Sequence, residues 1–517
     1  MSHDVLVLGG GLNGLVAATS LAKSGRSVAL LDARPTLGGL AAAEEFDDGF
    51  FTPGVLHDVS AFPPAIADAL ALSRFGLKIT DRPPRFRHGD GEGRVVTVPR
   101  DESDLDRIPA GPDRDGWRRT LALLGRVGPF LRGRLESPPP PLKPESLAGW
   151  MGLLGLGLEA RRLGQVDLIE LLRVLPMCVA DWAGESLSDP LLRAAVSAPA
   201  LEASFLGPWS GGTTALAILR AVRSRSSIEG GAPALVAALA AAADDAGVET
   251  LPGREVAEIL VREGRAHGVR LFDGNSLDAP IILSTIDPKT TLLDLVAPTE
   301  VSSSLAADTS RVRARGMTAK LDLALSSAPI FAGAADAGGA DGPVAWYRTG
   351  ADVDSLERAY DAAKYRRFSD PPLLEVHVPT HARPDLAPSG RHVASVLIHF
   401  APRNLDGGWT VEAREALREA ALIELERHAP GIRESVLHSR IRTPADLEDE
   451  FGLSGGHLHH GEHAPDQLLS LRPTHTCGEY RTPILGLFLG GSGSHPGGGL
   501  SGMPGLLAAR AIINAAG

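Results

Sequence analysis

The chain has 517 residues, 44% of them apolar, which is enough for two or more domains that each bury a core. Its 63 acidic residues outnumber the 51 basic ones, and a formal charge of −12 leaves no broad basic surface for nucleic acid, so nucleic-acid binding is excluded. Two cysteines, Cys178 and Cys477, lie too far apart for a Cys-x-x-Cys redox pair. This cysteine usage predicts a reducing, cytoplasmic location.

Membrane insertion is not expected. The first residues lead directly into an apolar stretch at residues 5–8, which leaves no room for a secretory leader. The longest apolar run, Trp150 to Leu158, has about nine residues, short of the ~20 that span a bilayer. A peripheral contact with a membrane stays open.

The N-terminal pattern predicts a β-α-β unit, with a strand at residues 4–8, a helix at about 12–24 and a strand at 27–32. Five prolines between Glu136 and Glu145 exclude a helix and predict a stiff connector. The apolar segment from Leu147 to Leu175 predicts a core-facing pair of helices, with membrane docking or lipid entry as the alternative.

Further along the chain, an alanine-rich segment at residues 234–247 predicts a helix. Three strand-like pieces follow, at about 254–261, 265–272 and 279–285, and predict a small antiparallel meander. The region 300–480 mixes helical segments such as 411–428 with the strand-like 393–400, which predicts α+β structure. Within it, residues 333–342 predict a mobile loop.

The residues from Gly9 to Gly14 form a G-x-G-x-x-G turn between the first strand and the first helix, the context in which this motif binds a dinucleotide. Gly9 permits the tight turn, Gly11 lets a pyrophosphate approach the backbone, and Gly14 lets the helix pack on the strand. The amides that start the helix at Leu12 and Asn13, with the helix dipole, attract phosphate.

Asp32 ends the second strand, where a carboxylate can accept both hydroxyls of an adenosine ribose. Because an acidic group repels a 2′-phosphate, NADP is disfavoured at this site. Arg34 follows, and behind it the doublet Gly38-Gly39 allows close packing against a long, extended dinucleotide. The doublet favours FAD over NAD.

The run from Gly486 to Gly491 predicts a buried strand that enters a glycine loop, and a helix starts at about Ser501. A second helix N-terminus is thus available to a flavin, whose reduction is favoured by donors aimed at its N1 and C2 carbonyl. A glycine-rich surface turn before a terminal helix is the plainer alternative.

These residues resemble the phytoene desaturase-like FAD-dependent oxidoreductase family, within the amine oxidase and carotenoid desaturase superfamily. The likeness is greatest to its pyridine nucleotide-disulphide oxidoreductase domain-containing branch, and it covers most of the chain in patches. The patches are Gly9–Gly39, Ile228–Gly231 with the helix after it, Ser284–Pro288, Gly452–Gly456 with His460–Glu462, and His495–Gly499.

The resemblance implies roles for particular residues. It implies that Gly9, Gly11 and Gly14 hold the pyrophosphate and that Asp32 binds the adenosine ribose. It also implies that the backbone of Val256 contacts adenine and that Gly38 and Gly39 pack against the stretch toward the ribityl chain. Gly491, Leu500 and Ser501 would then face the ribityl chain and the flavin ring. The chain departs from the family at Leu40, where members often carry arginine. With no second G-x-G-x-x-G unit, a separate pyridine-nucleotide domain is not expected.

The catalytic side chains are not identified by the sequence. His57 and His495 are candidates for an acid, base or donor beside the flavin, and histidines that merely hydrogen-bond a loop are the alternative. His457, His459 and His460 alternate without a set of cysteines, so no metal site is predicted.

We therefore predict an α/β fold. A Rossmann-like FAD-binding domain is assembled from residues 1–75, 225–300 and 480–517, and an α+β substrate domain is built from residues 76–224 and 301–479. The ligand is expected between them.

The predicted function is FAD-dependent oxidation of an apolar carotenoid-, isoprenoid- or lipid-like substrate, whose hydride passes to the flavin while an external electron acceptor of unknown identity reoxidises it. Three alternatives stay open: a flavin amine or amino-acid oxidase, a polyene isomerase or saturase that uses reduced flavin, and a flavin-bound structural or partner-binding subunit without turnover. Neither the substrate nor the oligomeric state is indicated.

Overall fold

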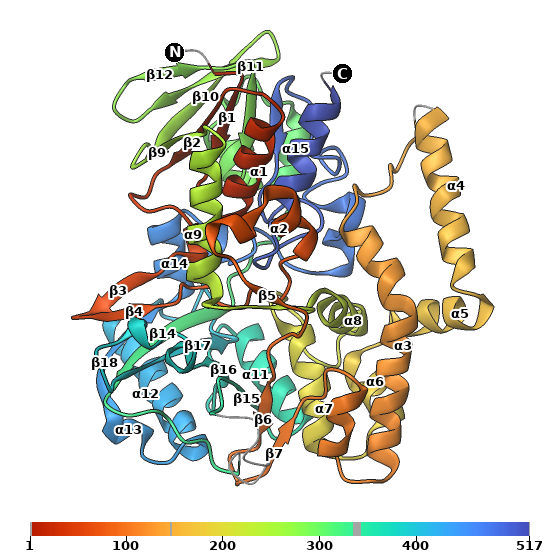
Figure 1. The fold of residues 1–517 in the computed structure, drawn as a ribbon, viewed down its shortest axis with the longest axis vertical. Helices are drawn as coiled ribbons and strands as arrows, with labels where there is room; N and C mark the ends of the chain where they lie inside the picture. Colours follow the sequence, from red (N-terminus) through yellow and green to blue (C-terminus); the bar gives the residue numbers. More distant parts are fainter. Residues whose placement is uncertain (1–2, 145–146, 334–342, 516–517) are drawn as a thin grey trace.

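A five-stranded parallel sheet lies at the end of the molecule where both chain ends are found (Figure 1). The computed structural model describes residues 3–144, 147–333 and 343–515. The strand order is β19 (Leu487–Leu489), β13 (Ile281–Ser284), β1 (Val5–Leu8), β2 (Val28–Asp32) and β9 (Glu249–Pro252), and all neighbours are parallel. Neighbouring strands of one sheet thus come from the start, the middle and the end of the chain.

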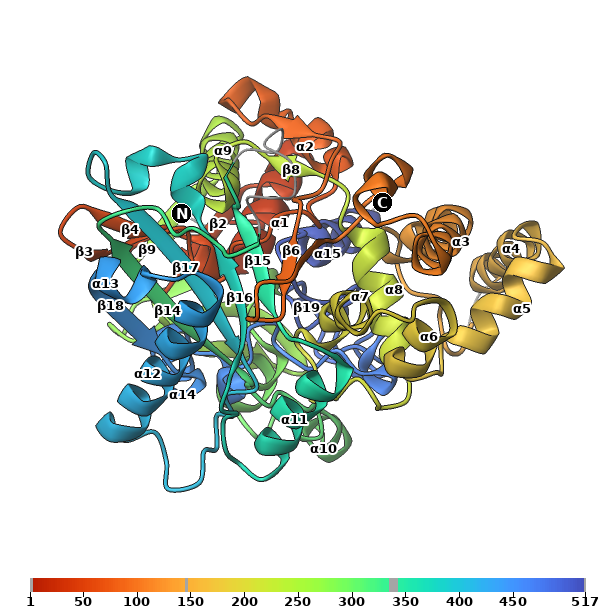
Figure 2. The same ribbon diagram turned by 90° about the horizontal axis from the view of Figure 1, so that it is seen from below.

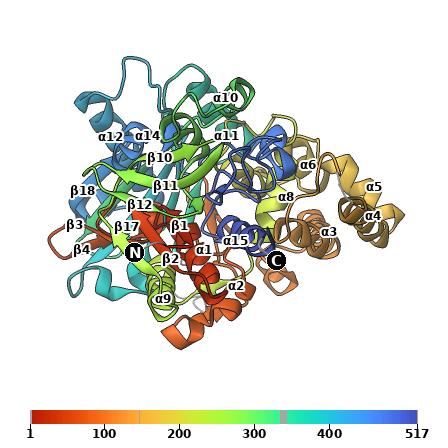
Figure 3. The same ribbon diagram turned by 90° about the horizontal axis from the view of Figure 1, so that it is seen from above.

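Helices cover one face of this sheet and a small antiparallel sheet covers the other (Figure 3). The helices are α1 (Leu12–Lys23), α9 (Gly231–Asp245) and α15 (Met503–Ala515), and α1 packs against both of the others. Val5 and Val7 of β1 belong to the helical core, whereas Leu6 and Leu8 belong to the core beneath the small sheet. Because β1 is buried on both faces, its sequence is a continuous apolar run. The expected Rossmann-like α/β fold is confirmed.

The small sheet differs from the expected meander in its third strand. It consists of β10 (Val256–Arg262), β11 (Arg265–Leu271) and β12 (Ser276–Asp278). The predicted strand at 279–285 is instead β13, which pairs with β1 in the parallel sheet, so its assignment to the meander was wrong. The run Ile281-Ile282-Leu283 is apolar on both faces, as a strand between two layers must be, whereas β12 alternates in exposure.

A seven-stranded mixed sheet forms the other end of the molecule (Figures 1 and 2). Its order is β18 (Val436–Arg442), β14 (Thr318–Leu325), β17 (His392–His399), β16 (Leu373–His377), β15 (Trp346–Thr349), β6 (Arg87–Gly89) and β7 (Val95–Thr97). One face packs apolar side chains against α12 (Val411–His428) and α13 (Ile432–Ser435). The opposite face carries buried polar groups, among them Lys320, Asp322, Glu375 and Ser395.

Polar contacts join the two sheets. Thr52 Oγ1 donates to Asp322 Oδ1 at 2.7 Å, and Arg442 Nη2 donates to Glu44 Oε2 at 2.6 Å. Both contacts start from the hairpin of β3 (Glu44–Asp47) and β4 (Phe50–Thr52). The hairpin therefore ties the seven-stranded sheet to the part of the chain that follows β2.

A group of helices lies beside the seven-stranded sheet. These are α3 (Pro112–Leu135), α4 (Leu147–Arg162), α5 (Gln165–Val174), α6 (Val179–Ser186), α7 (Pro190–Ser197) and α8 (Thr213–Arg223). The remaining elements are α2 (Pro64–Leu70), β5 (Ile79–Thr80), β8 (Ser227–Ile228), α10 (Ser303–Ser310), α11 (Val353–Lys364) and α14 (Pro444–Phe451). Residues 136–144 form no helix or strand, as their prolines predict, and the loop expected at 334–342 lies outside the described residues.

The pair α4 and α5 exists, but its expected core-facing position was wrong for α4 and holds only for one side of α5, where Leu171 and Val174 are buried. Trp150, Leu154 and Val166 are 58%, 67% and 80% exposed. Figure 2 shows both helices at the edge of the molecule, beyond α3. An apolar stripe indicates which face of a helix avoids water. It does not indicate whether that face packs against other residues of the same chain or against another molecule. Among the described residues, no helix is both long and apolar enough to cross a bilayer.

Candidate functional site

The turn between β1 and α1 depends on glycine at two points. Gly9 has a φ of +96°, a left-handed conformation that side chains rarely adopt. A Cβ on Gly14 would lie 1.8 Å from the carbonyl oxygen of Gly9, so α1 can approach the turn only without a side chain there. Gly11 caps α1 without a side-chain hydrogen bond, which leaves the first amides of the helix available to an anion.

Asp32 fastens this turn to the end of β2. Its Oδ2 accepts a hydrogen bond from the Gly10 amide at 2.6 Å, and its Oδ1 accepts one from the Arg34 amide at 2.7 Å. Burial raises the pKa of the Asp32 carboxyl, an effect that these two N–H groups oppose. The carboxylate is held at the carboxyl edge of the parallel sheet, where ligands bind in open α/β folds.

A cavity of about 600 Å³ opens at this edge, and we call it the dinucleotide cavity. Its walls include most of the residues predicted to bind the cofactor: Gly9, Gly11, Leu12, Asn13, Asp32, Arg34, Gly38, Gly39, Leu40, Val256 and Leu500. Three predicted residues do not line it. Gly14 packs against Gly9, a Cβ on Gly491 would lie 2.3 Å from the Thr285 carbonyl oxygen, and Ser501 lines a separate small cavity with Arg223.

Other lining residues were missed by sequence reasoning. Ile286 and Asp287 follow β13, and Phe451 and Leu453 lie at and after the end of α14. Asp287 also binds the second segment, because its Oδ1 accepts a hydrogen bond from Ser454 Oγ at 2.8 Å. Most of these residues fall in the patches of family resemblance, which was the available signal, but their convergence depends on long-range folding.

The walls of the dinucleotide cavity fit a dinucleotide. Within the described part of the chain, Asn13 Oδ1 and Arg34 Nη1 are buried without a hydrogen-bond partner. A Cβ on Gly11 would meet only the Gly39 Cα within 4 Å, at 3.9 Å, among these residues. The site therefore offers unpaired polar atoms and a backbone cradle that any side chain would fill, as ribose and pyrophosphate require.

Comparisons with known proteins agree with this geometry. Residues 7–62 match the family model of an NAD(P)-binding Rossmann-like domain. Over 99% of its length the chain is 29% identical to pyridine nucleotide-disulfide oxidoreductase domain-containing protein 2 of Mus musculus, covering 93% of that protein. It is 26% identical to a lycopene-forming phytoene desaturase of a Paracoccus species, over 99% of this chain and 97% of the other.

Solved structures share the fold. An oxidoreductase from Methanosarcina mazei superposes with a TM-score of 0.62 at 18% identity, over 99% of both chains. The chain is an oxidoreductase that is similar, over almost its whole length, to phytoene desaturases and to a pyridine nucleotide-disulfide oxidoreductase domain-containing protein. The Rossmann turn, Asp32 and the cavity walls described above form its candidate nucleotide-cofactor site.

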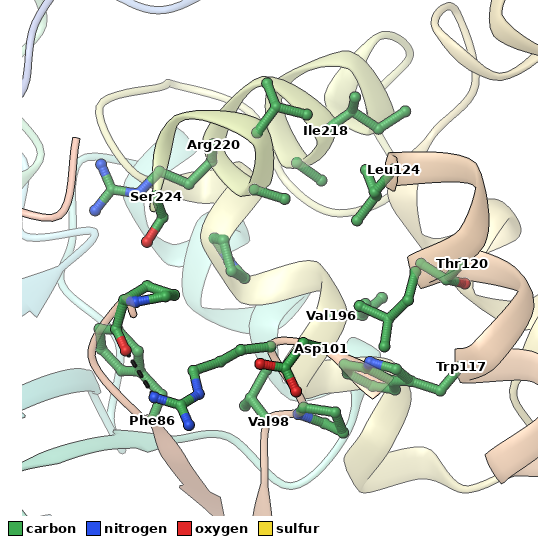
Figure 4. A pocket seen from close by; sticks show the side chains of 18 of the residues that line it. Phe86, Val98, Asp101, Trp117, Thr120, Leu124, Val196, Ile218, Arg220 and Ser224 are labelled. Atoms are coloured by element: carbon green, nitrogen blue, oxygen red, sulfur yellow. Dashed lines mark hydrogen bonds between the residues drawn. The ribbon is translucent and has the colours of Figure 1, made fainter. Parts of the chain in front are cut away.

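A second, more apolar cavity of about 700 Å³ lies in this oxidoreductase between α3, α8 and the chain segments just before β6 and just after β7. Figure 4 shows Phe86, Val98, Trp117, Leu124 and Val196 around it, with Arg220 and Ser224 on the wall formed by α8. We call it the apolar cavity. Its charged edge also includes Asp58 and Arg348.

Neither candidate histidine lines the dinucleotide cavity. His57 is buried, its Nδ1 lies 2.9 Å from Ser395 Oγ, and burial lowers its pKa. His495 Nε2 donates to the carbonyl oxygens of Arg134 and Ser137 at 3.1 Å each, and burial lowers its pKa to about 4. His495 thus fastens the proline-rich connector to the C-terminal glycine loop, a structural role that matches the alternative reading.

We expect Gly11→Val to abolish cofactor retention, because the side chain would occupy the backbone cradle while meeting little protein. The measurement is the flavin content of the purified, folded protein. Gly133→Val in α3 is the control, because a Cβ there also meets nothing within 4 Å among the described residues. Normal flavin content in Gly11→Val would contradict the assignment.

Asp32→Ala should weaken FAD binding roughly 10- to 100-fold, the range expected when a hydrogen-bonded charged acceptor is lost. Isothermal titration of the apoprotein with FAD measures this change. Asp4→Ala is a matched control at the other end of the sheet, since Asp4 accepts a hydrogen bond only from the Ser27 amide in the described structure. An unchanged dissociation constant in Asp32→Ala would mean that Asp32 does not bind the ribose.

Proposed function

We propose that the chain binds FAD and oxidises an apolar carotenoid-, isoprenoid- or lipid-like substrate. The observation that carries this proposal is the apolar cavity of about 700 Å³, which is walled by aromatic and aliphatic side chains. When bound, FAD supplies an acceptor for the hydride that leaves the substrate carbon. The phytoene desaturase activity named for the Paracoccus relative supports this substrate class.

The extent of the dinucleotide cavity supports FAD over a smaller nucleotide. Its lining includes Val256 of β10, Leu56 from the segment after β4, and Gly499 and Leu500 from the C-terminal glycine loop. The glycine turn and Asp32 lie along the same cavity. An extended dinucleotide with adenine at the β10 end would bring its flavin to the glycine loop.

The chain's own residues would bind and shield the substrate. Trp117, Trp182 and Phe86 supply large apolar surfaces, and burial of a hydrocarbon against them is favourable by roughly 25 cal/mol per Å². Arg220 and Arg348 are both paired with carboxylates, so neither is free to bind a substrate carboxylate as an amino-acid oxidase requires.

We propose further that α4 docks on the surface of a lipid bilayer. Its exposed apolar residues follow one helix face, with Leu147, Trp150, Met151, Leu154 and Leu158 between 58% and 78% exposed. The helix ends in Arg161 and Arg162, which are both exposed. If α4 lay on a bilayer, these two arginines would lie beside the lipid phosphates. A tryptophan- and leucine-rich face next to arginines is typical of helices that lie in a membrane interface. Contact with lipid would give access to apolar substrates.

A bulky residue in the apolar cavity should block substrate oxidation. Gly125 of α3 lines this cavity, and a Cβ there meets nothing within 4 Å in the described structure, so Gly125→Phe is expected to fold. Anaerobic flavin reduction by acyclic polyenes should slow roughly 10-fold or more, while reduction by dithionite stays unchanged. Gly133→Phe is the control, because Gly133 lies on the same helix, does not line the cavity and also has room for a Cβ.

Stopped-flow absorbance of the flavin measures these rates. If no polyene, isoprenoid or lipid donor reduces the flavin of the unaltered protein, the proposed function is wrong. Equal rates in the Gly125→Phe and Gly133→Phe proteins would instead show that the substrate binds elsewhere.

Charged residues on α4 should prevent membrane binding. We expect Trp150→Glu combined with Leu154→Glu to lower the fraction bound to phosphatidylcholine vesicles at least ~10-fold, because two large apolar side chains are lost from the contact. Val411→Glu, at a 76%-exposed apolar residue of α12, is the control. Co-sedimentation measures binding, and a change of oligomeric state without vesicle binding would identify a second copy of the chain as the partner.

A further inference from the structure

Glu202 lies between the two large cavities. Two small cavities of about 20 Å³ each separate them, and each has room for about one water molecule. The first shares Leu56 and Leu458 with the dinucleotide cavity, and the second shares Pro199 and Arg348 with the apolar cavity. Glu202 and His399 line both small cavities. Glu202 therefore lies between the two large cavities and lines neither of them.

Glu202 belongs to a buried cluster of carboxylates and guanidinium groups. Glu202 Oε2 lies 2.6 Å from Arg220 Nη2, and the same guanidinium nitrogen lies 2.9 Å from Asp58 Oδ2. Arg348 Nη2 lies 2.7 Å from Glu375 Oε2. Three carboxylates thus lie beside these two guanidinium groups in a cluster removed from bulk water, and the buried Arg223 is a third cation near Glu202 and Asp58.

Several other titratable groups face this cluster. His459 Nε2 is 4.0 Å from Glu202 Oε1, and burial lowers the pKa of this histidine well below its usual value. Burial likewise lowers the pKa of His399 to about 4, so both rings are neutral near pH 7. The buried Arg223 donates to the Gly498 carbonyl oxygen at 2.7 Å and keeps its charge at neutral pH.

Among the carboxylates, Glu202 is the one suited to exchange a proton. Burial, with the nearby carboxylates of Glu375 and Asp58, raises its pKa to about 7 in spite of Arg220. The pKa of Glu375 lies well below its ordinary value because Arg348 and His57 outweigh the effect of burial. Asp58 is already fixed by the Ser60 amide, which donates to its Oδ1 at 2.8 Å. A group with a pKa near neutrality can both take up and release a proton.

We propose that Glu202 is the proton acceptor of the oxidation, an inference that rests on the proposed function. As a carbon–carbon double bond forms, a hydride with its two electrons leaves one carbon for the oxidant, an oxidised flavin. The proton on the neighbouring carbon passes to a carboxylate oxygen of Glu202 when the substrate extends from the apolar cavity to the small cavity that Glu202 lines. Protonation of Glu202 then weakens its ion pair with Arg220. The proton leaves along the two water-sized cavities, which His399 also lines.

Infrared spectroscopy of the flavin-loaded protein tests the proton site without turnover. The unaltered protein should show a protonated-carboxyl C=O band that titrates near pH 7, and Glu202→Gln should lack it. Glu357→Gln is the matched control, since Glu357 of α11 is another carboxyl whose pKa is raised by burial but it lines neither large cavity. A band near pH 7 that persists in Glu202→Gln overturns the proposal.

Flavin reduction by an acyclic polyene tests the catalytic role. In the unaltered protein the rate should fall as the pH drops below about 7, because protonated Glu202 cannot accept a proton. Glu202→Gln should slow reduction at least ~100-fold and remove this pH dependence, with normal flavin content. Glu202→Asp, which keeps the acid, should partly restore the rate and the acidic limb of the profile.

The outcomes separate the two proposals. Reduction of the unaltered protein with an equal rate and pH profile in Glu202→Gln would show that Glu202 is not the acceptor, even though the proposed function holds. No reduction of the unaltered protein by any apolar donor would show that the proposed function fails, and the proton role of Glu202 would fail with it.

Discussion

The structure depends on backbone contacts that exist only because certain residues lack a side chain. Gly14 brings α1 against the turn after β1, where a Cβ would lie 1.8 Å from the Gly9 carbonyl oxygen. Gly505 brings α15 against the same helix, since its Cβ would lie 2.1 Å from the Asn13 carbonyl oxygen. Gly491 lets the loop after β19 pack against the end of β13, since a Cβ there would lie 2.3 Å from the Thr285 carbonyl oxygen. These contacts draw the two ends and the middle of the chain together around one cofactor cavity.

The tight packing around the glycine turn contrasts with the loose, charged region between the sheets. There, Arg220 and Arg348 hold three carboxylates beside two small cavities, at some cost in desolvation. Buried ion pairs contribute little net stability, so their position between the two large cavities is better explained by function. The same polar face of the seven-stranded sheet also anchors His57 through Ser395.

Much of the nucleotide site could be predicted because its signals are local. The G-x-G-x-x-G turn, the acidic end of β2 and the doublet Gly38-Gly39 all lie within the first 39 residues, and each lines or shapes the dinucleotide cavity. Where the site or the sheets depend on contacts between residues far apart in the chain, the prediction from sequence was wrong or missing. The strand β13 was assigned to the wrong sheet, and the opposite wall formed by Phe451 and Leu453 was not foreseen.

The sequence by itself determined the fold class and the chemistry of the cradle, because glycine, apolar runs and a terminal aspartate constrain the backbone wherever they occur. It also determined that α4 and α5 are apolar helices. Only the tertiary structure decided that α4 is exposed, that the apolar cavity lies beside α3, and that Glu202 meets Arg220. Burial, charge pairing and pKa arise from neighbours far apart in the chain, and no local pattern encodes those neighbours.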